Sequence, residues 1–168
     1  MNTKKPRTAL FDKPVPADDV VVRCVKLSDA LMARASLLFE SYGITVLQYN
    51  VLRILYVRDP DGEGMPIGAI GSRLMVKSID VSRLVDRLER NGLVERFRLT
   101  EDRRVVRVRL TRDGVDRVEK VHPPLVQHNI DLLAAISKSD LKQLATLLER
   151  TLAAVQAASP DSSTTRKE

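Results

Sequence analysis

Apolar residues recur every three or four positions between residues 78 and 90, a spacing that predicts an α-helix with one buried face. They are Val81, Leu84, Val85 and Leu88. Asn91-Gly92 follows directly, and this pair is typical of a helix C-terminus because glycine tolerates the positive φ that such an ending needs. The chain is therefore expected to change direction just after residue 90.

Beyond this stop the apolar spacing falls to two, which predicts β-strands. Val94 is followed by charged residues, and Val106, Val108 and Leu110 alternate with arginines. The polar residues 100–104 lie between the two runs and end in two arginines. This part of the chain is therefore predicted to form a helix, called the reading helix below, followed by a two-stranded hairpin, the wing.

Three further helices are predicted before residue 75. The first spans residues 18–42, with acidic residues at its positive N-terminal end. Thr45 is expected to cap the second helix, which should stop at a loop rich in Asp, Pro and Gly. Pro66 is expected to open a short third helix. Its Gly68 and Gly71 are expected to let a neighbouring helix approach closely.

Two helices are predicted after the wing. Thr111 should cap a long one, and Pro123-Pro124 should kink it near His122, because proline cannot complete the helical hydrogen-bond ladder. Ser137 should cap the last helix, with Asp140 as an imperfect capping-box partner. That helix carries a broad apolar stripe made of Leu141, Leu144, Leu147, Leu148, Leu152 and Val155.

The apolar faces of these helices exceed what one small unit can bury. Exposed stripes of this size mark an interface, and a symmetric dimer is the commonest way to cover them. The predicted class is mainly α (α+β), a winged helix-turn-helix with a two-stranded wing and long N- and C-terminal dimerisation helices. The predicted parts are a disordered arm (1–17), dimerisation helices (18–42 and 112–158), a winged unit (43–111) and a disordered tail (159–168).

Positive charge is concentrated around the reading helix and the wing. Fourteen Lys and Arg and nine Asp and Glu lie between Arg73 and Lys120, so this stretch holds five of the net six positive charges. A duplex major groove admits a helix and a narrow minor groove attracts arginine, which favours double-stranded DNA as the partner. A merely solvated, charge-rich surface is the plainer alternative.

Other classes of protein fit the sequence poorly. No apolar run is long enough to cross a membrane, so no membrane partner is expected. The single cysteine, Cys24, excludes an internal disulfide framework and favours the cytoplasm. We find no phosphate-binding glycine loop, HExxH motif or zinc-type cysteine pair, so no enzyme activity, metal or cofactor is expected. His122 and His128 are either incidental or lining for a pocket near the kink.

The N-terminal half of the reading helix is the part expected to enter the groove. Two interpretations of Ile79 remain open: contact with a thymine methyl group, or packing under the wing. Asp86 precedes Arg90 by four residues, a spacing typical of an intrahelical ion pair. Arg87 is expected to reach phosphate or to pair locally. The candidate DNA contacts of the reading helix are Ser78, Ile79, Ser82, Arg83 and Arg87.

The wing supplies a second set of candidate DNA contacts. Asp102 accepts hydrogen bonds well and is expected to brace Arg104 two residues on, which would aim its guanidinium. Arg103 and Arg104 are then candidates for contact with the minor groove and with phosphate. A tip that is merely soluble is the alternative.

The order of these elements resembles the MarR family (multiple antibiotic resistance regulators). The resemblance covers residues 20–158 and rests on three motifs: LVDRLERNGLVER (84–96), EDRR (101–104) and VRLTRDG (108–114). It places Ser82 and Arg83 where the family commonly has a Thr-Arg or similar pair. It also implies a cytosolic homodimer that binds a palindromic operator.

Many members of that family release DNA when a small, often phenolic, ligand binds between the DNA-binding and dimerisation regions. The resemblance therefore implies a transcriptional repressor that responds to a small aromatic effector. Two alternatives remain open. One is a redox-sensing regulator acting through Cys24, since one branch of the family senses organic hydroperoxides with a first-helix cysteine. The other is a winged-helix module that binds something other than DNA.

Overall fold

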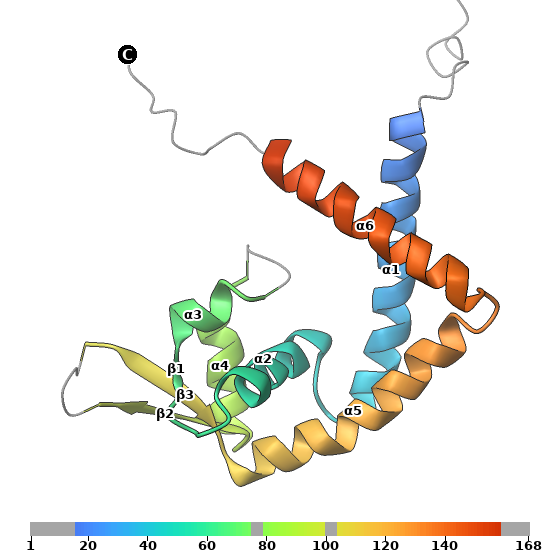
Figure 1. Ribbon diagram of the computed structural model, residues 1–168. Helices are drawn as coiled ribbons and strands as arrows, with labels where there is room; N and C mark the ends of the chain where they lie inside the picture. The colour runs from blue at the N-terminus through green and yellow to red at the C-terminus, as the bar shows by residue number, and fades with distance from the viewer. Residues whose placement is uncertain (1–15, 75–78, 100–103, 159–168) are drawn as a thin grey trace, which may run out of the picture. The chain divides into compact units, whose positions relative to one another are not determined.

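The computed structural model describes residues 16–74, 79–99 and 104–158 of the chain (Figure 1). Most of the predicted N-terminal arm, the turn at residues 75–77, most of the wing tip and the C-terminal tail lie outside the described residues. The chain divides into two compact units, residues 1–125 and residues 126–168. Each unit is described by itself below.

The described chain is mainly helical with one small antiparallel sheet, as predicted. Its elements in order are α1 (Pro16–Glu40), α2 (Val46–Arg58), β1 (Met65–Pro66), α3 (Ile67–Gly71), α4 (Val81–Arg90), β2 (Val94–Arg98), β3 (Val106–Leu110), α5 (Arg112–Leu132) and α6 (Lys138–Ala158). Within the first unit, α2, α3 and α4 gather beside the sheet (Figure 1). None of the described helices is both long and apolar enough to cross a membrane.

The predicted ends of α1 and α2 agree closely with the structure. Helix α1 starts at Pro16, two residues earlier than predicted, because proline suits the first helical position. Thr45 caps α2 through a full capping box: its Oγ1 accepts from the Gln48 amide (3.2 Å), and its own amide donates to Gln48 Oε1 (2.9 Å). The predicted cap at Thr45 is confirmed.

The sheet contains a third strand that the sequence did not reveal. Strand β1 pairs antiparallel with β3, so the strand order is β1-β3-β2. Two residues, one of them a proline, are too short to show an alternating pattern. The predicted close approach is right at Gly71, where an added Cβ would lie 3.1 Å from a methyl group of Val81. It is wrong at Gly68, which has nothing within 4 Å.

The reading helix, α4, begins at Val81 rather than near Ser78. Asp80 is its N-cap, and the carboxylate accepts a hydrogen bond from the Arg83 amide (3.2 Å). The predicted ending at Asn91-Gly92 is confirmed, with Gly92 at φ +69°. Strands β2 and β3 then form the predicted hairpin, in a register that pairs Val94 with Leu110 and Arg98 with Val106.

Thr111 and Gly114 fix the start of α5 against the loop that follows α4. Thr111 Oγ1 accepts from the Gly114 amide (3.1 Å) and donates to the Gly92 carbonyl (2.6 Å). A Cβ added to Gly114 would lie only 2.0 Å from the Leu93 carbonyl oxygen. The VRLTRDG motif (108–114) therefore has a physical reason: the cap needs Thr111, and the close backbone approach needs Gly114.

Helix α5 continues through Pro123-Pro124 to Leu132, and the kink near His122 stays a prediction. The Ser137 cap of α6 is confirmed, since its Oγ accepts from the Asp140 amide (3.1 Å). The Asp140 carboxylate accepts a hydrogen bond from the Ser137 hydroxyl (2.8 Å) rather than from a backbone amide. That geometry is the imperfect capping box that the sequence predicted.

The first unit holds a continuous hydrophobic core. Leu84, Val85 and Leu88 of α4 are buried in it, as their spacing predicted. The core also takes in Phe39 at the end of α1 and Val118 and Val121 of α5, so it reaches beyond the predicted unit 43–111. By contrast, α6 has no buried residue, and its apolar stripe is exposed.

Candidate nucleic-acid interface

Three of the predicted DNA contacts lie together on the outer face of α4. Ser82, Arg83 and Arg87 are exposed. Their side chains make no hydrogen bond or ion pair with any residue that the structure describes. The buried residues Leu84, Val85 and Leu88 hold the opposite face of the helix in the core, which keeps the two guanidinium groups on the outside. Ser78, predicted as a fourth contact, lies outside the described residues.

Ile79 is not on the outer face of the reading helix. It precedes the N-cap Asp80, is partly buried, and packs against the hydrophobic core. An apolar residue at this position commonly packs toward the helix that follows. The structure therefore shows packing of Ile79 against the core, whereas contact with a base or packing under the wing stays a prediction.

Asp86 and Arg90 do not form the predicted intrahelical ion pair. Arg90 Nε instead donates to the backbone carbonyl of Asp86 (3.3 Å). The Asp86 carboxylate pairs with the guanidinium of Arg96, which comes from strand β2. Local spacing favoured Arg90, but the strand brings a second arginine to the same carboxylate. This contact between α4 and β2 was missed by the sequence analysis.

Arginines on the wing strands bind their own protein. The Arg107 guanidinium donates to the backbone carbonyls of Glu63 (3.3 Å) and Gly64 (2.9 Å). Arg109 pairs with Glu95 (2.6 Å) and stacks over the Phe97 ring at 4.7 Å. These side chains attach the loop before β1 to the sheet. The charge concentration near the wing therefore overstates how many arginines are available to a partner.

Only one of the predicted wing contacts can be placed. Arg104 is exposed and lies two residues before β3. Asp102 and Arg103 lie outside the described residues, so the predicted bracing of Arg104 by Asp102 stays a prediction. Arg104 also takes part in an interaction within the chain.

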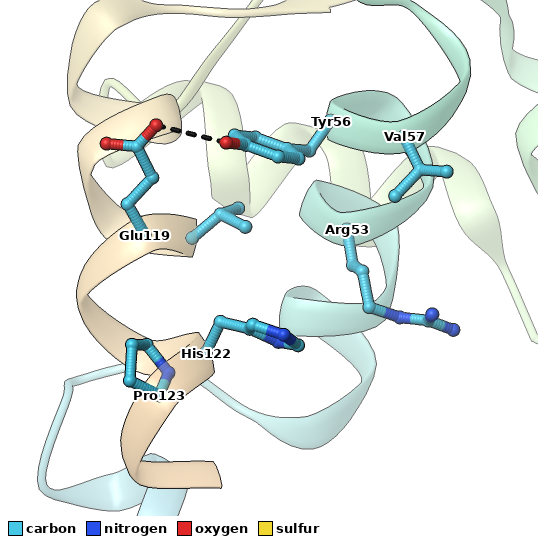
Figure 2. A pocket seen from close by; sticks show the side chains of 7 residues that line it. Arg53, Tyr56, Val57, Glu119, His122 and Pro123 are labelled. Atoms are coloured by element: carbon cyan, nitrogen blue, oxygen red, sulfur yellow. Dashed lines mark hydrogen bonds between the residues drawn. The ribbon is translucent and has the colours of Figure 1, made fainter. Parts of the chain in front are cut away.

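A pocket of about 440 Å³ lies between α2 and α5 in the first unit. Tyr56 donates from α2 to Glu119 Oε1 on α5 (3.0 Å), and the His122 imidazole points from α5 toward α2 (Figure 2). His122 thus lines a pocket next to the prolines, one of the two roles offered for it. The lining residues are Arg53, Tyr56, Val57, Val118, Glu119, His122 and Pro123.

The pKa values of two tyrosine hydroxyls beside this pocket are raised. The hydrogen bond to the Glu119 carboxylate raises the pKa of Tyr56. Burial raises the pKa of Tyr49, whose hydroxyl shares a hydrogen bond with His122 Nδ1 (3.1 Å), and the charge of Arg53 acts in the opposite direction. Arg53 itself has no hydrogen bond or ion pair to any described residue, so its guanidinium is available at the pocket.

The described residues contain no cluster of three or more His, Cys, Asp or Glu side chains that could hold a metal ion. The single cysteine, Cys24, is partly buried on α1. Arg23 and Lys26 lie close to it in the sequence, and Arg23 is already paired with Asp19 (2.7 Å).

Comparison with known proteins identifies the architecture. Residues 44–106, from the end of α1 to the start of β3, match the model of the MarR family. The HTH-type transcriptional regulator YkoM of Bacillus subtilis is 31% identical over 111 residues, which cover 66% of this chain and 70% of that protein. The chain belongs to the MarR family.

Two further proteins are similar to this MarR-family chain. The organic hydroperoxide resistance transcriptional regulator of Bacillus subtilis is 32% identical over 111 residues, covering 66% of this chain and 71% of that one. The crystal structure of a MarR transcription factor from Planctomyces limnophilus has a TM-score of 0.62 at 31% identity. The matched region covers 82% of this chain and 98% of the chain in that crystal structure. The predicted class of protein, a winged-helix transcriptional regulator, is therefore confirmed.

Proposed function

We propose that this MarR-family regulator is a cytoplasmic, ligand-responsive repressor that binds a palindromic operator as a homodimer and acts by binding alone, without catalysis. The observation that carries the proposal is the outer face of α4, where Ser82, Arg83 and Arg87 are exposed and lack side-chain partners among the described residues. An arginine on a helix in the major groove can bond guanine bidentately. The wing, with Arg103 and Arg104, is assigned to the minor groove and to phosphate.

A homodimer is supported by apolar residues that no part of their own unit covers. On α1, Val21 and Val25 are 61% and 64% exposed, and on α6, Leu152 is 58% exposed. A second copy of the chain would cover both stripes, and two-fold symmetry would present two reading helices to a palindrome.

The pocket between α2 and α5 is the proposed effector site. Apolar and aromatic side chains line it, and Arg53, which has no ion pair among the described residues, supplies a partner for an anionic group. The effector class that fits this lining is a small aromatic carboxylate, whose ring would lie on the apolar surface. Neither a cofactor nor a metal has a role in the proposal.

The test of the proposed function starts from a pool of random duplexes. Duplexes retained by the protein are sequenced, and the expected result is a palindrome with two half-sites about one helical turn apart. Hydroxylated benzoic acids are then added to the purified complex. We expect the acid to release the DNA from the wild-type protein and to release it less effectively from Arg53→Gln. A neutral phenol, which lacks the carboxylate, should act equally on both proteins. These results together would support the effector site. Retention of random duplexes without a shared motif would contradict the proposal.

Redox sensing through Cys24 is a second candidate, favoured by the similarity to a hydroperoxide resistance regulator. The pairing of Arg23 with Asp19 weighs against it, since a reactive thiolate needs nearby cations or donors. We expect Cys24→Ser to leave effector-driven release from DNA unchanged, as measured by titration of the preformed complex. Loss of peroxide-driven release in that variant, with wild-type release intact, would favour the redox candidate instead.

A further inference from the structure

We propose that Arg96 is a positioning residue for DNA reading, which fixes the reading helix α4 to the wing strand β2. The inference rests on the proposed function, because it assumes that α4 reads base pairs. Arg96 would act through α4, by setting how the helix lies against the sheet and by offsetting two of its negative charges.

The guanidinium of Arg96 contacts α4 at three points along one face. It pairs with the Asp86 carboxylate, with Glu89 Oε2 (3.1 Å), and, through Nη2, with the backbone carbonyl of Ser82 (3.1 Å). These residues are spaced 0, 4 and 7 along the chain, which spans about two turns of helix. The backbone amide of Arg96 also donates to Glu89 Oε1 (3.0 Å). One side chain therefore fixes both the tilt and the rotation of α4.

Only arginine can make this set of contacts. A guanidinium is a rigid planar fork with several donors, whereas the lysine ammonium is a single point charge on a flexible stem. The side chain of Arg96 is 24% exposed, less than those of Asp86 (50%) and Glu89 (38%). Its Nε is buried without a hydrogen-bond partner among the described residues. The guanidinium is thus oriented by its α4 contacts at the cost of one unsatisfied donor.

The second contribution of Arg96 is electrostatic. Asp86 and Glu89 are carboxylates on the helix that also carries Arg83 and Arg87, and carboxylates near DNA phosphates are repelled. Pairing both with one guanidinium reduces that repulsion where the helix approaches the duplex. Ser82, whose carbonyl accepts from Arg96, lies next to Arg83 on the candidate base-reading surface. A change in the orientation of α4 would therefore move the atoms that discriminate between bases.

The wing offers a matched control on the neighbouring strand. Arg109 pairs with Glu95 across the two strands and donates to the Gly62 carbonyl (3.5 Å), so both of these partners lie on the sheet or on the loop before β1. It is a strand arginine paired with a glutamate, like Arg96, but those bonds do not reach α4. Arg109→Lys should disturb the wing locally and leave the orientation of α4 unchanged.

The experiment compares wild type, Arg96→Lys and Arg109→Lys. For each protein, the affinity for the duplex selected by wild type is divided by the affinity for duplexes with one substituted base pair per half-site. We expect Arg96→Lys to lower this ratio by about fivefold or more, since a well-formed bidentate contact supplies discrimination of that size. Arg109→Lys should keep the ratio within about twofold. Circular dichroism establishes that each variant is folded.

A purely structural role for Arg96 would give a different result. Partial unfolding reduces the active fraction and lowers all affinities together, which leaves the ratio unchanged. An unchanged ratio in folded Arg96→Lys overturns the inference. If Arg96→Lys does not fold, Glu89→Gln is used instead, because it weakens two of the contacts with Arg96. A lowered ratio in that variant supports the inference, and an unchanged ratio overturns it. A wild-type protein without any sequence preference would overturn the proposed function itself, and this inference with it.

Discussion

The two units of the chain bury their apolar residues in different ways. In the first unit, Val85 and Leu88 of α4 have no exposed surface, and they share one core with residues from α1, α2 and α5. In the second unit, α6 has five leucines, yet none of its residues is buried. The first unit can be stabilised by its own packing, whereas the second presents an apolar surface that its own residues do not bury.

This difference means that the folding stability of the first unit and the association of two chains can be tested separately. A substitution in the first core should change the unfolding of the protein at any concentration. A substitution on the α6 stripe should change a quantity that depends on concentration, because it acts on association. The following variants, in order of expected effect, test whether the two regions behave in this way.

Truncation of Leu88 should have the largest effect. Leu88→Ala removes a fully buried side chain from α4 and leaves a cavity, so we expect the free energy of unfolding to fall by about 3–5 kcal/mol. Urea denaturation followed by circular dichroism measures it. A loss below about 1 kcal/mol would mean that the first unit does not depend on this core.

Gly114 tests the junction between α4 and α5. Gly114→Ala would place a Cβ 2.0 Å from the Leu93 carbonyl oxygen, and the backbone must move to accommodate it. We expect a loss of about 3 kcal/mol in unfolding free energy. Gly68→Ala is the matched control, because Gly68 is helical with open space around it, and alanine there should be stabilising by about 1 kcal/mol. Equal effects in the two variants would contradict the role given to Gly114.

The third variant tests the uncovered stripe. Leu148→Glu places a charge in the middle of the apolar stripe of α6, and we expect the dimer dissociation constant to rise by about a hundredfold. Thr146→Glu adds the same charge on the opposite face of the helix and should leave the dissociation constant nearly unchanged. Analytical ultracentrifugation over a range of concentrations measures both. A wild-type protein that is monomeric at micromolar concentration would contradict the proposed dimer, and with it the proposed palindromic operator.

Features that depend on local spacing were predictable from the sequence. Each of the caps at Thr45, Thr111 and Ser137 uses a bond to an amide three residues on, so the pattern of residue types is sufficient to find it. The ending of α4 at Asn91-Gly92 is likewise local. The same applies to the apolar faces of the helices and the alternation in the wing, which predicted the order of the elements.

Features that depend on contacts between distant residues were not predictable. Asp86 has an arginine four residues on, but its carboxylate pairs with Arg96 across the turn between α4 and β2. The short strand β1 is defined by its pairing with β3, and the residue pattern of Met65–Pro66 does not predict a strand. The charge count near the wing could not distinguish Arg107, which binds the loop carbonyls, from Arg83, which has no side-chain partner among the described residues.

The central claim is that α4 reads base pairs and the wing supplies sequence-independent affinity. It is tested most directly by titrating Arg83→Ala and Arg104→Ala against the selected operator and its singly substituted forms at two salt concentrations. Arg83→Ala should cost about 1–3 kcal/mol on the operator and relax the preference at one base pair in each half-site. Arg104→Ala should weaken all sites by similar factors and reduce the salt dependence. If Arg104→Ala changed the base preference while Arg83→Ala lowered all sites equally, the roles of helix and wing would be reversed.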